Sequence, residues 1–130
     1  MSQSKSSNNP EPPVTIFVVD DEQMLLDLAA AVLQPLGFDV RTFSDPRKAL
    51  KAFLDARPEV LVTDYAMDGM NGLELVRECR HVNPKQKIIM LSGTVDEHIY
   101  ANLPQKPDRF LVKPYPVHEF IEAIREMVAR

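Results

Sequence analysis

Five short apolar runs, each followed by a longer segment, limit what this chain can fold into more than any other feature. The runs are Thr15–Val19, Phe38–Phe43, Val60–Thr63, Lys87–Leu91 and Phe110–Val112. Four of them are nearly continuous in Val, Ile, Leu, Phe or Met, which is typical of parallel strands covered by helices on both faces. The second, "FDVRTF", alternates apolar and polar residues, which indicates an edge strand.

The segment after the first run, "QMLLDLAAAVLQPLG", predicts a helix that packs on the sheet. Its apolar residues share one face, which we expect to be buried: Leu25, Leu28, Ala29 and Val32. Pro35 and Gly37 follow, and both residue types commonly end a helix.

Two later segments carry clear helix starts. One opens with Ser44 or Asp45 as the N-cap, and another opens with Asn71. The single cysteine, Cys79, falls on the apolar face of the helix that begins at Asn71. We therefore interpret it as a core residue.

The fourth gap differs from the others because it contains Pro104 and Pro107, which a helix interior does not tolerate. We expect a short helix from about Asp96 to Leu103, followed by an irregular connection. A last helix begins at Val117, where apolar residues again recur at helical spacing.

Five strand–helix units with right-handed crossovers predict an α/β fold with an open, doubly wound parallel sheet. The expected arrangement is flavodoxin-like, with strand order 2-1-3-4-5 and a short or irregular fourth helix. In such sheets the functional crevice lies at the carboxyl ends of the strands.

Composition sets further limits. The chain has 130 residues, which fits one domain, and a net charge of -4, which argues against a nucleic-acid-binding surface. One cysteine permits no internal disulfide, and a reducing cytoplasm is the expected location. No apolar run reaches the roughly 18 residues that span a membrane.

The N-terminal stretch "MSQSKSSNNPEPP" is rich in Ser, Asn and Pro. We expect residues 1–13 to be a disordered tail and residues 14–130 to form the domain. A tag or linker remnant is a competing interpretation of the tail.

Polar side chains gather where the predicted strands end. They are Asp20 and Asp21 after the first strand, Asp64 after the third, Ser92 and Gly93 after the fourth, and Lys113 after the fifth. Taken singly, such residues often cap a helix or form a turn. Their joint placement at one edge of one sheet instead indicates a functional site.

Three carboxylates within a few ångströms cannot all stay ionised without a cation. Oxygen ligands at an open site favour Mg²⁺, and the sequence offers no cluster of Cys and His for zinc. A divalent ion and Lys113 would bind a phosphoryl group, and Ser92 can donate to its oxygens. The pattern predicts phosphoryl transfer to a carboxylate nucleophile.

The set "VVDDE", "VTDYAMDGMNG", "LSGT" and "LVKP" resembles the receiver domain of two-component response regulators, and the likeness covers Val14 to Arg130. The resemblance implies that Asp64 accepts a phosphoryl group from a sensor histidine kinase or phosphotransfer protein. It also implies a downstream protein target. In the family the fourth helix, with the last strand and the last helix, usually forms the face that contacts this target or, in a homodimer, a second copy. Because Pro104 and Pro107 interrupt the fourth helix, we expect this face to be altered here.

The resemblance also assigns roles to individual residues. Asp20, Asp21, Asp64 and the backbone carbonyl of Ala66 would hold Mg²⁺. Lys113 would contact the phosphoryl group, with a cis bond to Pro114. Ser92 and Phe110 would form the switch that responds to phosphorylation.

One departure from the family pattern lies beside the phosphoacceptor. Asp68 stands where the family usually has proline, and Asn71 stands where it usually has an acid. The hypothesis is that Asp68 makes the local potential more negative and changes the Mg²⁺ affinity or the lifetime of the phosphoryl group.

Two rival functions remain. A Mg²⁺-dependent phosphatase-like enzyme usually needs an Asp-x-Asp pair, whereas Asp20 and Asp21 are adjacent and Asp64 stands alone. A pseudo-receiver that only binds partners would not need the complete set of acids, Ser92 and Lys113.

Overall fold

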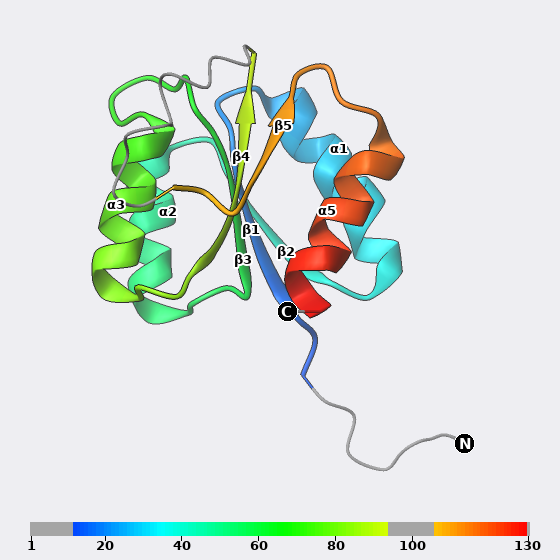
Figure 1. Ribbon diagram of the computed structural model, residues 1–130, viewed down its shortest axis with the longest axis horizontal. Helices are drawn as coiled ribbons and strands as arrows, with labels where there is room; N and C mark the ends of the chain where they lie inside the picture. The colour runs from blue at the N-terminus through cyan, green and yellow to red at the C-terminus, as the bar shows by residue number, and fades with distance from the viewer. Residues whose placement is uncertain (1–11, 94–105, 130) are drawn as a thin grey trace.

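A parallel sheet forms the centre of the computed structural model, which describes residues 12–93 and 106–129 (Figure 1). The strands are β1 (Thr15–Val19), β2 (Asp39–Phe43), β3 (Val60–Asp64), β4 (Lys87–Ser92) and β5 (Arg109–Val112). They lie in the order β2-β1-β3-β4-β5, with every neighbouring pair parallel. This confirms the flavodoxin-like, doubly wound fold class and the edge position of β2. The predicted runs match the strands to within one residue at either end.

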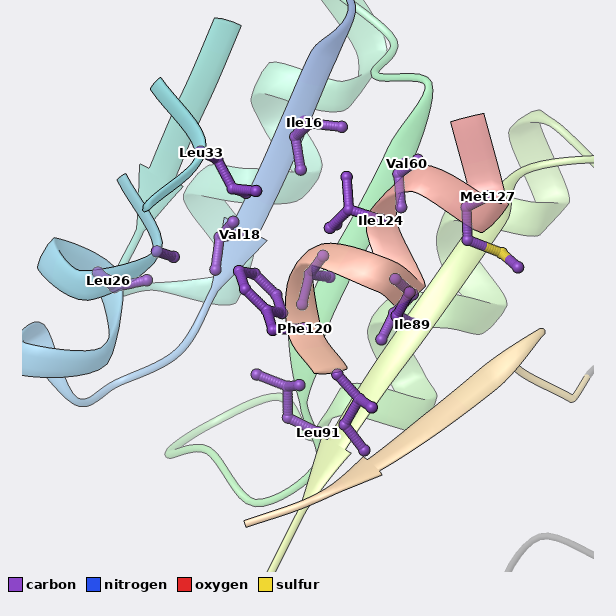
Figure 2. Close-up of a cluster of buried hydrophobic side chains, with 14 residues drawn as sticks. Ile16, Val18, Leu26, Leu33, Val60, Ile89, Leu91, Phe120, Ile124 and Met127 are labelled. Carbon is purple, nitrogen blue, oxygen red and sulfur yellow. The ribbon is translucent and has the colours of Figure 1, made fainter. Parts of the chain in front are cut away.

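Helices cover both faces of the sheet (Figure 1). On one side lie α1 (Gln23–Leu33) and α5 (Val117–Ala129), and on the other lie α2 (Pro46–Asp55) and α3 (Gly72–Val82). Each side has its own apolar core because strand side chains alternate between the faces. Figure 2 shows the α1–α5 core, in which Phe120 and Ile124 of α5 face β-strand residues such as Val18.

The predicted buried face of α1 is partly wrong. The buried residues are Leu26, Ala29 and Leu33, whereas Leu28 is 43% exposed. The true face is turned by one residue from the predicted one, or about 100° around the axis. Apolar residues fill positions 24–26 and 28–33, so either face is compatible with the sequence pattern, and contact with β1 selects one. The helix ends as expected: a 3-10 turn over Gln34–Leu36 leads to Gly37 at a φ of +96°.

The predicted helix starts of α2 and α3 are confirmed. The Asp45 carboxylate accepts a hydrogen bond from the Arg47 backbone N–H at 2.9 Å. In α3 the Asn71 side chain accepts from the Glu74 N–H at 2.9 Å, and the Glu74 carboxylate accepts from the Asn71 N–H at 3.1 Å. This reciprocal pair satisfies two N–H groups that a helix start leaves open. Cys79 is fully buried, as predicted.

Some sequence predictions fall outside the described residues. The expected short helix from Asp96 to Leu103 does so, as does all but the end of the expected tail. Among the helices in residues 12–93 and 106–129, none is long and apolar enough to cross a bilayer.

A polar cluster holds the strand starts together at the amino edge of the sheet. The buried Gln86 side-chain amide donates to the carbonyls of Pro58, Glu59 and Lys87 at 3.1, 3.3 and 3.2 Å. It therefore links the connections that precede β3 and β4.

Arg80 extends this cluster to β5. Its guanidinium donates to the Gln86 carbonyl and pairs with Asp108 at 3.0 Å. The same Asp108 oxygen accepts the Ile88 N–H at 2.8 Å. We call Arg80, Gln86 and Asp108 the Gln86 network.

Candidate functional site

Three acids meet at the carboxyl edge of the sheet. One carboxylate oxygen from each of Asp20, Asp21 and Asp64 lies within 4.8 Å of the others. Asp20 follows β1 and Asp64 ends β3, and these strands are neighbours, which explains the convergence. Asp20 is 0% exposed and Asp64 is 5% exposed, whereas Asp21 faces solvent.

Backbone groups fix the position of Asp20. Its Oδ1 accepts the Glu22 N–H at 2.9 Å, and its own N–H donates to the Phe43 carbonyl at the end of β2 at 3.0 Å. Oδ1 of Asp20 is therefore used in the turn after β1, and Oδ2 points into the site.

Lys113 brings a positive charge to the two buried acids. Its ammonium lies 3.0 Å from Oδ2 of Asp20, 3.2 Å from Oδ2 of Asp64 and 3.5 Å from Oε1 of Glu22. Its backbone N–H donates to the Ser92 carbonyl at 2.8 Å, which ties the end of β5 to the end of β4. The Lys113–Pro114 bond is cis, as the resemblance implied.

Asp64 presents its two oxygens differently. Oδ1 accepts a hydrogen bond from the backbone N–H of Tyr65 at 2.9 Å, and Oδ2 faces Lys113. The Tyr65 N–H also lies 2.9 Å from the Leu91 carbonyl of β4. The carboxylate is thus fixed at one oxygen by the backbone, and its other oxygen faces the cation.

The charges in the site are coupled. Burial raises the pKa of the Asp64 carboxyl, the nearby Asp20 charge raises it further, and Lys113 offsets only part of this. Burial alone would lower the pKa of Lys113, but the hydrogen bond and charge of Asp20, with those of Asp64, outweigh it, and the pKa is raised. The lysine therefore stays protonated, and the raised pKa of Asp64 reflects its burial beside the Asp20 carboxylate.

The other predicted site residues occupy the same edge or the strands that lead to it. Ser92 ends β4 and is 4% exposed. Ala66 is exposed on the connection after β3. Phe110 lies on β5 opposite Met90 and packs against the α2–α3 core, partly buried.

Two residues near the site have no role in the sequence-based prediction. Glu22 reaches Lys113, and its place directly after the two aspartates was the available signal. Tyr115 is half-buried, and burial raises its pKa; nothing in the sequence marked it. Together they border a cavity of about 430 Å³ lined by Glu22, Leu25, Leu28, Lys113, Pro114 and Tyr115.

The donor set fits a hard divalent cation. All the converging ligand atoms are carboxylate oxygens, and no cysteine or histidine from residues 12–93 or 106–129 belongs to the cluster. Two of the acids are buried and only partly neutralised by Lys113, so an additional cation would relieve their repulsion.

Comparison with known protein families identifies the kind of domain that carries this site. The family model "Response regulator receiver domain" matches residues 16–125. The chain belongs to this family. The match covers all four strand ends that carry the site, so it includes every site residue described above.

Named relatives agree with this assignment. The receiver domain is 31% identical over 120 residues to "Probable transcriptional regulatory protein TcrX" of Mycobacterium tuberculosis, covering 91% of this chain and 51% of that protein. It is 30% identical over 116 residues to "DNA-binding response regulator MtrA" of the same species, covering 88% and 50%. The chain therefore spans about half the length of these curated relatives.

A solved structure shares both fold and sequence. It is the response regulator protein TrrA of Thermotoga maritima in complex with Mg²⁺-BeF. The TM-score is 0.78 and the identity is 30%, over 88% of this receiver domain and 98% of that chain.

Proposed function

We propose that this receiver domain is a phosphoacceptor switch in a two-component system, with Asp64 as the residue that takes the phosphoryl group. The donor is a phosphohistidine on a sensor histidine kinase or phosphotransfer protein. The observation that carries the proposal is the convergence of the Asp64 carboxylate with the Asp20–Asp21 pair and with the Lys113 ammonium.

The transfer step uses groups that the site already orients. A free lone pair of the Asp64 carboxylate attacks phosphorus, a new O–P bond forms, and the P–N bond to the donor imidazole breaks. The imidazole leaves with the bonding electron pair and takes up a proton. Lys113 lies 3.2 Å from Asp64 Oδ2, where it stabilises the negative charge of the resulting acyl phosphate.

Mg²⁺ fits the same site. Asp20, Asp21, Asp64 and the carbonyl of Ala66 would hold it. When bound, it neutralises charge on the acids and on the phosphoryl oxygens. The complex of TrrA with Mg²⁺-BeF supports this choice of ion by analogy.

Ser92 and Phe110 provide the route from chemistry to signal. Ser92 ends β4 beside Lys113, and its hydroxyl would donate to a phosphoryl oxygen on Asp64. Phe110, on the neighbouring β5, would turn inward in response. A local change in charge then biases a two-state surface that a partner reads.

The partner on the output side is a protein. The relatives TcrX and MtrA are named as transcriptional or DNA-binding regulators, and the chain matches about half of each. With a net charge of -4, this domain would act on nucleic acid only through another part or partner. In this proposal residues 14–130 form the signalling unit, residues 1–13 precede it as a tail, and the setting is the cytoplasm.

Incubation with acetyl phosphate and Mg²⁺ tests the proposal. We expect one phosphoryl adduct by intact mass spectrometry, lost in Asp64→Asn and retained in Asp55→Asn, a matched change of an exposed acid. Chelation of Mg²⁺ with EDTA should abolish the adduct. Sustained release of phosphate at enzymatic rates would instead indicate the phosphatase-like alternative, and no reaction at all would indicate a pseudo-receiver.

A further inference from the structure

The first residue of α3, Gly72, lies directly against the backbone of Asp64. A β-carbon on Gly72 would be 2.2 Å from the Asp64 carbonyl oxygen, 3.0 Å from its carbonyl carbon and 3.0 Å from the Tyr65 Cα. β-carbons essentially never approach other atoms closer than 3.0 Å. Only glycine allows α3 to start this close to the peptide unit that carries Asp64.

Backbone conformation does not explain the glycine. Gly69, earlier in the same connection, has a φ of +85°, which other residues adopt rarely, but Gly72 begins a regular helix. Within a helix alanine is favoured over glycine by about 1 kcal/mol. The requirement at position 72 is therefore for space beside Asp64.

Both sides of this contact are anchored. The start of α3 is fixed by the paired hydrogen bonds of Asn71 and Glu74, and the helix is held on the sheet by buried Leu75. On the strand side, the Tyr65 N–H donates to the Leu91 carbonyl at 2.9 Å, and the Tyr65 carbonyl accepts the Gly72 N–H at 2.8 Å. A displacement at Gly72 would therefore pass to the Asp64–Tyr65 peptide.

We infer that Gly72 is a positioning residue for the phosphoacceptor: the missing side chain sets the depth at which Asp64 sits relative to Asp20 and Lys113. This inference rests on the proposed function. Asp20 and Lys113 are carried by β1 and β5, so a shift of the β3 end changes their distances to Asp64. Widening a 2.2 Å contact to 3.0 Å or more requires a shift of about 1 Å.

Gly72→Ala tests the inference. A misplacement of about 1 Å can lower a reaction rate about 100-fold, and we expect the rate of phosphorylation by acetyl phosphate to fall by that factor. We expect Mg²⁺ affinity, measured by NMR titration without any phosphodonor, to weaken by about tenfold. Cys79→Ala is the matched control, because it destabilises the same helix two turns away and should leave rate and affinity unchanged.

A second variant separates positioning from stability. Asn71→Ala removes the cap that anchors the start of α3, so in the Gly72→Ala background the first turn can move away from Asp64. The double variant should be less stable than Gly72→Ala and yet recover part of the rate and of the Mg²⁺ affinity. If Gly72→Ala alone does not fold, the same comparison is made in trimethylamine N-oxide, which favours the folded state.

The outcomes are distinct. Wild-type rate and Mg²⁺ affinity in folded Gly72→Ala, equal losses in Cys79→Ala, or no recovery in the double variant would each overturn the inference. If the wild-type chain takes no phosphoryl group, the proposed function fails, and the Mg²⁺ titrations still decide the role of Gly72.

Discussion

The ammonium of Lys113 lies 3.0 Å from Oδ2 of Asp20, although the two residues are 93 positions apart in the chain. Asp20 is fully buried, and the lysine side chain is 18% exposed. A buried ion pair costs desolvation, and removing one partner leaves an uncompensated charge. The pair, with Asp64 beside it, therefore makes the metal-free protein depend on Lys113 for stability.

Lys113→Met should destabilise the protein by about 3 kcal/mol in EDTA, because two buried carboxylates lose their cation. Urea unfolding followed by circular dichroism measures this loss. Added Mg²⁺ should restore part of it by occupying the acidic cluster. Lys85→Met, which changes an exposed lysine, should have little effect, and an equal loss in both variants would contradict the role of Lys113.

Asp64→Asn should stabilise the metal-free protein at neutral pH. The pKa of Asp64 is raised in the folded state by burial and by Asp20, so its ionised form costs stability. The unfolded carboxyl ionises near 3.8, so the wild type should lose stability relative to Asp64→Asn as the pH rises from there through the folded pKa. Urea midpoints of both proteins between pH 4 and 8 in EDTA measure the difference. Midpoints that stay parallel across this range would contradict the predicted repulsion.

Asp68 should increase the affinity for Mg²⁺ modestly. It is exposed on the connection after Asp64, where the family pattern has proline. Asp68→Asn removes only the charge and should weaken binding by about twofold at low salt, with less effect at high salt. Asp68→Pro also adds rigidity, so comparing the two variants separates charge from loop stiffness. Asp55→Asn, at the far end of α2, is the control, and an unchanged affinity and phosphoryl lifetime in both variants would remove the hypothesis.

Cys79 should be unreactive in the folded protein. Burial, with a smaller effect of the Glu78 charge, raises the pKa of its thiol to about 12. Reaction with a disulfide reagent at pH 8 should be slow in buffer and fast in urea, because the thiolate forms only after unfolding. Fast labelling without denaturant would show that α3 opens readily.

Gln86→Met should lower the free energy of unfolding by about 2 kcal/mol. The variant lacks the buried side-chain amide that donates to three carbonyls, and it leaves those carbonyls without this donor. Urea unfolding measures the loss, and Gln34→Met, at an exposed position, is the control. Phosphorylation of Asp64 should proceed at the wild-type rate. A slower reaction would show that the two edges of the sheet are coupled.

The sequence was sufficient for the architecture and for the acid cluster. Strands buried on both faces carry a strong local signal, and parallel strands bring their ends to one edge. The sequence pattern alone therefore predicts that Asp20, Asp64 and Lys113 lie together. Caps such as Asn71 were also predictable, because their partners lie within one turn.

Features that depend on distant contacts were not predictable. The predicted buried face of α1 included Leu28, which is in fact exposed. The apolar residues of α1 fit two helical faces, and only packing on β1 determines which one is buried. The role of Gly72 was not predicted, because its requirement comes from the carbonyl of Asp64. Gln86 serves three carbonyls from two separate connections, which no local pattern reveals.

The Gln86 network has a mechanical consequence for signalling. It fastens the starts of β3, β4 and β5 to one another, while the reacting groups stand at the opposite ends of the same strands. Because the strands are linked at their starts, their carboxyl ends have more freedom to move relative to one another. A displacement of Asp64 would therefore move the backbone least at the Gln86 network. It would move the backbone most at the carboxyl ends of β4 and β5, where Ser92 and Lys113 lie.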